Sequence, residues 1–368
     1  MFRVLLEDPD VGRIIGLVRA SSEAEARDKI RSCAKLGKWW QDEYDPRVEV
    51  WLGDLSQPRL GLGNQHWLDL TGRMRIDGII HNGARVNWLD NFAMLKATNV
   101  DSTQNVLTAI STMPIPCPLT YVGGGYLPSP ADTQEQIADK LANACGYDQT
   151  KFLSRMIVEK YNRQLDQHHN PNFPRARIIQ PGFIAGTRWE GVAHPDDFLW
   201  RFSYSILSLG SVSEDLRKTH LPVAGVEQIA ALVASSILRT QGKETVDCHD
   251  GISVAALCEI LSACTGLTIK TICQEDWLTA LRIEVENAGL DHPFLPVLDW
   301  FEANIWQFIE APPTKSAGTP FLDRRDTIAA LEKSTEYLVS LGLLPMGRDG
   351  CSRSKDTNHT VPCFKRST

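Results

Sequence analysis

The feature that most constrains the fold is a regular alternation of short apolar runs with helical patterns along the first half of the chain. Five runs are rich in aliphatic residues and are bounded by glycine, proline or polar residues, at residues 13–19, 48–52, 78–81, 119–122 and 176–179. Helical patterns lie between them, notably at residues 22–36, 99–110 and 147–165. Strands that alternate with helices predict a doubly wound α/β fold with a parallel sheet. We expect the first run to be buried on both faces of that sheet.

The pattern changes beyond about residue 190. Residues 195–209 are helical in pattern and rich in aromatics, and residues 253–264 and 277–288 look like amphipathic helices, the first with Ser253 as N-cap. We therefore expect a sheet domain over residues 1–190 and a smaller, mainly helical domain over residues 191–345. Residues 176–186 and about 220–250 are expected at the interface or in the sheet. Residues 346–368 are polar and aperiodic, which predicts a disordered tail.

Composition excludes several classes of partner and compartment. The net charge of -7 and the absence of a Lys/Arg cluster argue against nucleic acid. No apolar run approaches the roughly 18 to 20 residues that span a bilayer, so no membrane association is expected. The nine cysteines are scattered and never spaced as Cys-x-x-Cys, and His81 is too isolated for a metal ligand, so we expect reduced thiols and no metal site. The first residues do not resemble a signal peptide, so a cytoplasmic location is expected.

Tyr147 and Lys151 form the most informative pair of polar residues. Their spacing of four places phenol and ammonium on one face of a helix. A nearby ammonium lowers the pKa of a phenol, which would let Tyr147 exchange a proton with a carbonyl oxygen near neutral pH. Many helices carry this spacing by chance, so the pair gains meaning only from its neighbours.

Polar and small residues follow several of the predicted strands, where an open α/β sheet binds its ligands. Arg19 suits a 2′-phosphate or an adenine ring, or is a solvated surface arginine. Asp54 suits an adenine amine, or forms a turn with Gly53. The segment 81–88 has small residues that let the backbone approach a ligand, or it is a tight turn, and Asn99 is interpreted as a helix N-cap. The glycines at 123–125 and 61–63 do not satisfy the dinucleotide-binding fingerprint.

Taken together, these segments resemble the thioester reductase domain that ends many nonribosomal peptide synthetases and polyketide synthases, a relative of the carboxylic acid and aminoadipate reductases. The resemblance covers most of residues 2 to about 345. The segments that carry it are residues 16–20, 53–56, 60–62, 80–88, 99–100, 121–126, 146–151, 181–187 and 196–201.

The resemblance implies a Rossmann-like fold of the extended short-chain dehydrogenase type, with NADPH as cofactor. The substrate would be an acyl or peptidyl chain tethered by phosphopantetheine to a carrier protein, released as an aldehyde or, after a second reduction, an alcohol. Tyr147 would protonate the developing oxyanion, and Lys151 would hold the ribose and tune the phenol. Residues 196–201 would belong to the domain that covers the acyl chain. The implied cofactor-binding residues are Arg19, Asp54, Leu55, Asn82, Ala84, Asn99, Tyr147, Lys151, Pro181 and Phe183.

The sequence departs from the family in three places. The first strand and its glycine-rich turn are not in the sequence, so two strands are expected to lack a ladder partner between them. Gly123-Gly124 stands where the family carries a Ser or Thr that binds the substrate carbonyl, and Thr120 is expected to face elsewhere. Gln180 stands where an arginine is usual.

Three interpretations remain open. The chain is a working reductase from which roughly 20 to 30 N-terminal residues, an αβ unit, are absent. Alternatively, it is a cofactor-free member that releases the chain without reduction, by a Dieckmann-type cyclisation. Finally, it is a noncatalytic remnant that binds a carrier protein. Since carrier proteins are acidic, a docking surface is predicted around Arg201, Arg217 and Lys218.

Overall fold

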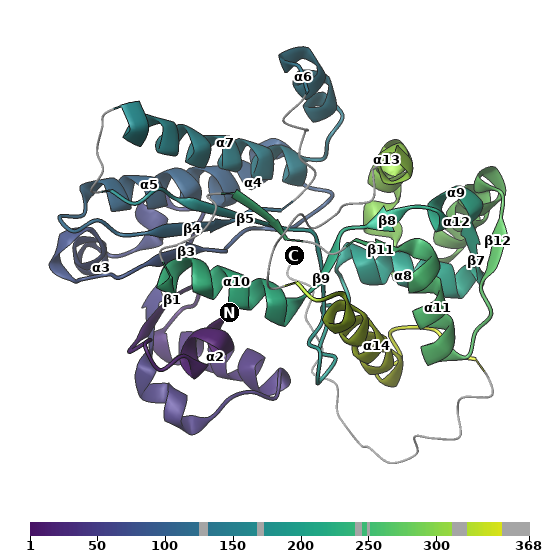
Figure 1. Cartoon of the computed structure of the whole chain (residues 1–368), viewed down its shortest axis with the longest axis horizontal. Coiled ribbons are helices and arrows are strands. Elements are labelled where there is room, and N and C mark those ends of the chain that lie inside the picture. Colours follow the sequence, from purple (N-terminus) through teal and green to yellow (C-terminus); the bar gives the residue numbers. More distant parts are fainter. Residues whose placement is uncertain (125–131, 168–172, 240–244, 249–250, 311–321, 348–368) are drawn as a thin grey trace.

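The computed structural model describes residues 1–124, 132–167, 173–239, 245–248, 251–310 and 322–347 (Figure 1). Gly125 and Tyr126 of the predicted glycine turn and residues 348–368 of the predicted tail lie outside these residues. The strands are β1 (Ile14–Val18), β2 (Val48–Leu52), β3 (Ile79–His81), β4 (Leu119–Val122), β5 (Arg177–Pro181), β6 (Phe183–Ala185), β7 (Ser211–Ser213), β8 (His220–Leu221), β9 (Val223–Gly225), β10 (Thr245–Cys248), β11 (Ile252–Ser253) and β12 (Lys270–Ile272). The α-helices are α1 (Phe2–Glu7), α2 (Glu23–Leu36), α3 (Asn64–Leu68), α4 (Phe92–Lys96), α5 (Ser102–Thr112), α6 (Gln134–Ala142), α7 (Gly146–Gln167), α8 (Phe198–Leu209), α9 (Glu214–Arg217), α10 (Val226–Leu238), α11 (Val254–Thr265), α12 (Gln274–Ala288), α13 (Leu298–Glu310) and α14 (Arg324–Ser340).

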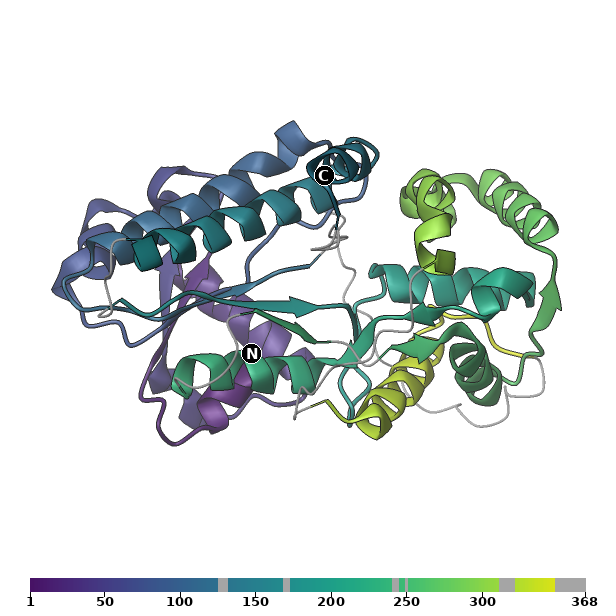
Figure 2. The same cartoon turned by 45° about the horizontal axis from the view of Figure 1, so that its top comes forward.

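A parallel sheet with helices on both faces forms the centre of the first part of the chain. Its strand order is β10-β5-β4-β3, and every neighbouring pair is parallel. Helices α5 and α7 cover one face, and α10 covers the other (Figures 1 and 2). Alternate residues of β5 separate accordingly, since Ile178 packs with Val158 of α7 and Ile179 packs with Val233 of α10. The predicted α/β fold with a parallel sheet is confirmed.

The sheet is divided between β1 and β3. Strands β1 and β2 pair with each other in parallel, but β1 does not pair with β3 among the described residues. This is the expected gap between two strands. Only Gly16 of β1 is buried, and the Leu17 side chain is 37% exposed. The prediction that this strand is buried on both faces is therefore wrong, because the side chains of Ile14, Ile15 and Val18 are also only partly covered.

The second part of the chain is mainly helical and has its own hydrophobic core. Helices α8, α11, α12 and α13 contribute to it, together with α14. The side chains of Trp200, Trp277, Phe202 and Phe301 are at most 2% exposed. Ala185 of β6 also joins this core, whereas Ala224 and Val233 pack against the parallel sheet. The division into domains at residue 190 stays a prediction.

Most helix starts follow local sequence signals. The Ser22 hydroxyl accepts a hydrogen bond from the Glu25 amide, and Ser253 does the same for Ala256, which confirms Ser253 as an N-cap. The prediction that Asn99 is an N-cap is wrong. The helix begins about two turns earlier at Phe92, where Asn91 accepts from the Met94 amide, and it continues through a π-helical turn, Ala97–Asp101, into α5.

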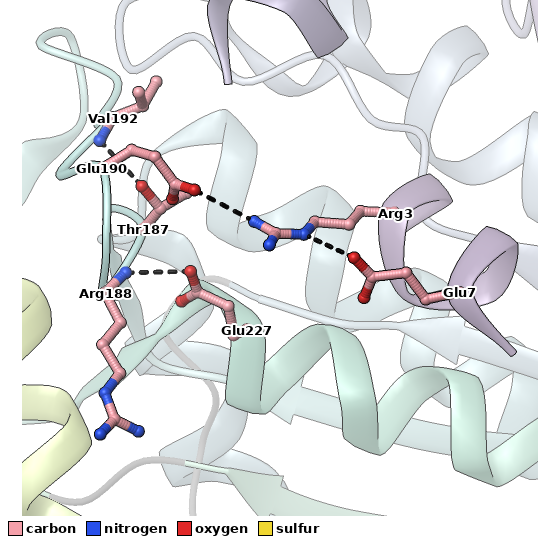
Figure 3. Close-up of polar contacts among 7 residues, drawn as sticks. All are labelled: Arg3, Glu7, Thr187, Arg188, Glu190, Val192 and Glu227. Atoms are coloured by element: carbon pink, nitrogen blue, oxygen red, sulfur yellow. Dashed lines mark hydrogen bonds and ion pairs between the residues drawn. The ribbon is translucent and has the colours of Figure 1, made fainter. Parts of the chain in front are cut away.

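A polar network ties α1 to the turn after β6 and to the start of α10 (Figure 3). The Arg3 guanidinium lies 3.0 Å from Glu7 and 3.4 Å from Glu190. In the same turn, the Arg188 amide donates to Glu227, with a distance of 2.9 Å. The pair of Arg3 with Glu190 therefore joins α1 to this turn, and the bond from Arg188 to Glu227 joins the turn to α10.

Candidate active site

Tyr147 and Lys151 lie in the first two turns of α7, beside the carboxyl end of β4. Gly146 lets α7 begin there, since a Cβ at this position would lie 2.4 Å from the Asn91 carbonyl carbon. The Lys151 ammonium donates to the Val122 carbonyl oxygen over 2.9 Å, and it lies 4.8 Å from the centre of the Tyr121 ring. The predicted placement of both groups at the end of a parallel strand is thus seen in the structure.

Burial controls the electrostatics of the pair. Lys151 is 3% exposed, and desolvation lowers the pKa of its ammonium to about 7. Burial also raises the pKa of the Tyr147 phenol, and the Asp148 carboxylate acts in the same direction. The prediction that Lys151 lowers the phenol pKa is therefore wrong for the folded chain. The phenol stays protonated at neutral pH, which is the form that donates a proton.

Gly123 and Gly124 follow β4 and face this pair. A Cβ at Gly124 would lie 3.1 Å from the Tyr147 hydroxyl oxygen and 3.6 Å from Lys151 Cε. The backbone at Gly124 has φ of 141°, which favours glycine. The Thr120 hydroxyl does not compensate for the lost side chains, because it lies 2.6 Å from the Ser236 hydroxyl of α10, on the opposite face of the sheet. The expectation that Thr120 faces elsewhere is confirmed.

Asn99 connects the segment after β3 to α7. Its Oδ1 accepts from the Arg85 amide at 2.8 Å, and its Nδ2 donates to the Arg85 carbonyl at 3.1 Å and to the Thr150 hydroxyl at 3.0 Å. Asn99 is 3% exposed, and these three bonds use most of its capacity. The structure therefore shows Asn99 as a residue that positions the 82–90 segment; its predicted cofactor contact stays a prediction.

Trp88 lies between Tyr147 and the aromatic core of the helical part. Its ring centre is 5.7 Å from that of Tyr147 and 4.5 Å from that of Trp300. Phe183, which follows Pro181 at the end of β5, stacks on Phe198 of α8 with ring centres 5.1 Å apart. Residues 80–88 carry part of the family resemblance, but the sequence pattern predicts no role for Trp88.

The residues predicted for the adenosine end lie after β1, β2 and β3. Arg19 is exposed at the end of β1, and its positive charge acts on Asp54 after β2. Hydrogen bonds from the Ser56 hydroxyl and amide are the main cause that lowers the pKa of Asp54. A Cβ at Gly83 would lie 2.5 Å from Leu55 Cδ1, so Leu55 contacts the segment that contains Asn82 and Ala84.

The docking surface around Arg201, Arg217 and Lys218 stays a prediction, but the structure shows the surroundings of two of these residues. The Arg201 side chain is 12% exposed; its guanidinium lies 2.7 Å from the Asp196 carboxylate and donates to the Pro293 carbonyl. The prediction that Arg201 is an open basic residue is therefore wrong, since its guanidinium is largely buried and paired with Asp196. Lys218 is exposed, with Asp215 at 3.4 Å. His81 is a core residue, 5% exposed beside Thr103.

The residues present fit the two ends of a nicotinamide dinucleotide. Arg19 and Asp54 offer an exposed cation and an acceptor to the adenosine end, and the Tyr147 hydroxyl and Lys151 ammonium, which lie together beside Gly124, suit the nicotinamide ribose. The sequence has no Gly-x-x-Gly-x-x-Gly turn for the pyrophosphate. In the described part of the chain, no group of His, Cys, Asp and Glu could hold a metal ion. No helix there is long and apolar enough to cross a membrane.

Comparisons with known proteins agree with this geometry. Residues 1–232 match the model of an NAD-binding family described as male sterility protein. Nonribosomal peptide synthetase 5 of Gibberella zeae is 33% identical over 92% of this chain and 3% of its own length. The PhqB reductase domain from Penicillium fellutanum has a TM-score of 0.76 and 28% identity, over 92% of this chain and 89% of that one.

A more distant structure, a thiolation-reductase di-domain from an archaeal nonribosomal peptide synthetase, has 14% identity and a TM-score of 0.62, and it shows the fold alone. It covers 92% of this chain and 73% of that one. The chain spans between 3% and 24% of the length of the curated relatives that it matches. By its matching family model, its relatives and its fold, the chain belongs to the male sterility protein family of NAD-binding proteins and to the reductase domains of nonribosomal peptide synthetases.

Proposed function

We propose that the chain catalyses the NADPH-dependent reduction of a carrier-bound acyl or peptidyl thioester and releases it as an aldehyde. The observation that carries the proposal is the convergence of Tyr147, Lys151 and the side-chain-free Gly124 at the carboxyl end of β4. A protonated phenol and a buried amine would there meet the carbonyl group of the substrate. The bound cofactor would supply the hydride.

The residues of the site have separate roles in this reaction. Tyr147 donates its proton to the carbonyl oxygen as negative charge develops there, since its raised pKa keeps the phenol protonated. Lys151, with a pKa of about 7, gains a proton when anionic or polar partners arrive and then holds the ribose hydroxyls. Trp88 packs beside the phenol and limits the access of water to it.

Arg19 supports NADPH over NADH. Its guanidinium is exposed at the end of β1 and lies near Asp54, so a 2′-phosphate would meet a cation and the ribose would meet an acceptor. The remaining predicted contacts, Leu55, Asn82, Ala84, Pro181 and Phe183, would supply the walls of the cofactor site. Asn99 would act through the 82–90 segment that it positions.

We further propose that the helical part, over residues 191–345, covers the acyl chain and the phosphopantetheine arm of a carrier protein. Phe183 and Phe198 support this, because their stacked rings join the start of β6 to α8. The Gibberella relative, by its name, is a peptide synthetase, and the archaeal neighbour pairs a thiolation unit with its reductase. Both suit a carrier-borne substrate.

One observation favours a second candidate function, nonreductive release by a Dieckmann-type cyclisation. Gly123 and Gly124 offer no hydroxyl to the substrate carbonyl. A buried amine such as Lys151 could then act as the base that starts ring closure.

One experiment separates the candidates. The purified chain, and a form extended by a strand and glycine-rich turn from a relative, are titrated with NADPH and incubated with octanoyl-pantetheine thioester. Reduction predicts NADPH oxidation and octanal in at least one form. For cyclisation, a β-ketoacyl-glycyl pantetheine thioester replaces the octanoyl probe, and its cyclised product must form without NADPH. If neither form of the chain yields octanal or the cyclised product, both proposals are contradicted.

A further inference from the structure

The side chain of Gln180 occupies the space beside Gly123. A Cβ at Gly123 would lie 1.9 Å from Gln180 Oε1 and 2.8 Å from Gln180 Cδ. No side chain fits at position 123 unless the amide moves. The two departures of this sequence from its family, at Gly123 and at Gln180, are therefore in contact, and the one makes room for the other.

Gln180 lies on the same face of the sheet as the proposed proton donor. Ile178 of β5 packs with Val158 of α7, and side chains two residues apart in a strand share a face, so Gln180 also lies on the α7 face. Gly123, which contacts Gln180, is bonded to Gly124, which contacts Tyr147. The Gln180 amide and the Tyr147 phenol therefore lie beside two adjacent glycines, whose Cα atoms are about 3.8 Å apart.

The Gln180 amide has no protein partner that explains its burial. The residue is 7% exposed, and its Oε1 is buried without a hydrogen bond. Its Nε2 makes no hydrogen bond among the described residues. Unlike Oε1, Nε2 is not completely buried, so a ligand can reach it. A buried amide without partners costs about 1 to 3 kcal/mol, which a hydrogen-bonding ligand would offset.

We propose that the Gln180 carboxamide contacts the carbonyl group of the bound substrate and donates a hydrogen bond to its oxygen beside Tyr147. A primary amide has two N–H donors, so it supplies the interaction that a hydroxyl at 123 or 124 would have made. This assignment rests on the proposed function, because it needs a substrate carbonyl at Tyr147. It gives Gln180 a direct role in stabilising the developing oxyanion.

The test replaces the amide without changing the length of the side chain. Gln180→Met in the full chain, in the form that binds NADPH, is assayed with octanoyl-pantetheine thioester. We expect kcat to fall about 10²-fold while the Kd of NADPH changes less than about twofold. Gln228→Met is the matched control, since Gln228 is also 7% exposed with an unpaired Oε1 but lies on α10. Its kcat should match that of the unchanged chain.

A binding measurement keeps the assignment testable if reduction itself fails. Calorimetry with the octanoyl amide of aminopantetheine, which cannot be reduced, should show at least about fivefold weaker binding to Gln180→Met than to the unchanged chain. Equal binding and equal kcat in the two would overturn the role of Gln180 and leave the reductase proposal standing. Weaker binding without NADPH oxidation by the unchanged chain would contradict the reductase proposal and support the carbonyl contact. If the unchanged chain does not bind the amide, the assignment is wrong.

Discussion

Replacing Lys151 with methionine should stabilise the fold and abolish catalysis. Lys151 is 3% exposed, and burial lowers its pKa from 10.5 to about 7. At pH 7 the unfolded chain binds this proton fully and the folded chain binds it by half, which corresponds to about 4 kcal/mol of destabilisation. Methionine fills similar space without a charge. It loses the hydrogen bond to Val122, which contributes about 1 to 2 kcal/mol.

The net stabilisation expected at pH 7 is therefore about 2 to 3 kcal/mol. With an unfolding entropy of about 2.1 cal/mol/K per residue, a chain of 368 residues that unfolds in one step should gain about 3 to 4 °C in Tm. The gain has a defined pH dependence. A lysine whose folded pKa is lowered costs nothing above pH 10.5, because both states are then neutral, and the cost grows as pH falls from 10.5 to about 7.

The assay is calorimetric unfolding of the Lys151→Met variant and of the unchanged chain between pH 6 and the alkaline limit of folding. Lys160→Met is the control, since Lys160 lies on the same helix but is exposed, and its Tm difference should be small and constant with pH. A lower Tm of Lys151→Met at pH 7, or a Tm gain that does not shrink toward alkaline pH, would refute the reasoning that burial dominates the energetics of Lys151.

Three further variants test the separate roles of the site. Tyr147→Phe should lose about 10²-fold or more in aldehyde formation while NADPH binds as before, because only the proton donor is removed; full turnover would exclude Tyr147 from the mechanism. Arg19→Ala should weaken NADPH at least about tenfold and leave NADH unchanged in direct titrations, and an equal effect on both cofactors would contradict the 2′-phosphate contact. Asn99→Ala leaves the Arg85 backbone without its two side-chain hydrogen bonds, so the free energy of unfolding in urea should fall by about 2 to 4 kcal/mol. The N-cap variant Asn91→Ala is the control and should lose about 1 kcal/mol. A smaller loss in Asn99→Ala than in Asn91→Ala would argue against the role of Asn99 in holding Arg85.

The fold could be predicted from the sequence where the signals are local. The apolar runs of β2 and β4 are short and bounded by glycine or proline, so their ends agree with the structure. The helix that carries Tyr147 and Lys151, α7, is 22 residues long, and its helical pattern is unbroken in the sequence. By contrast, Asn91 and Asn99 are both suitable caps, and only the packing of Asn99 against Arg85 and Thr150 decides between them.

The chemistry of the site depends on contacts that no local pattern contains. Gln180 and Gly123 lie 57 residues apart and meet because β4 pairs with β5, so the sequence shows two unusual residues but not that they touch. The direction of the Tyr147 pKa also needs tertiary structure. The spacing of four brings the ammonium near the phenol, but the burial of both groups outweighs that charge.

The transfer of hydride to a thioester carbon tests the central claim most directly. The chain, in the form that binds NADPH, is given octanoyl-pantetheine thioester and NADPH that carries deuterium on the transferred position of the nicotinamide, and the product is analysed by mass spectrometry. The account predicts octanal with one deuterium on its aldehyde carbon, and at least about 10²-fold slower formation of this product by Tyr147→Phe. Consumption of a thioester without deuterium in any product would show that release does not involve reduction and would contradict the account.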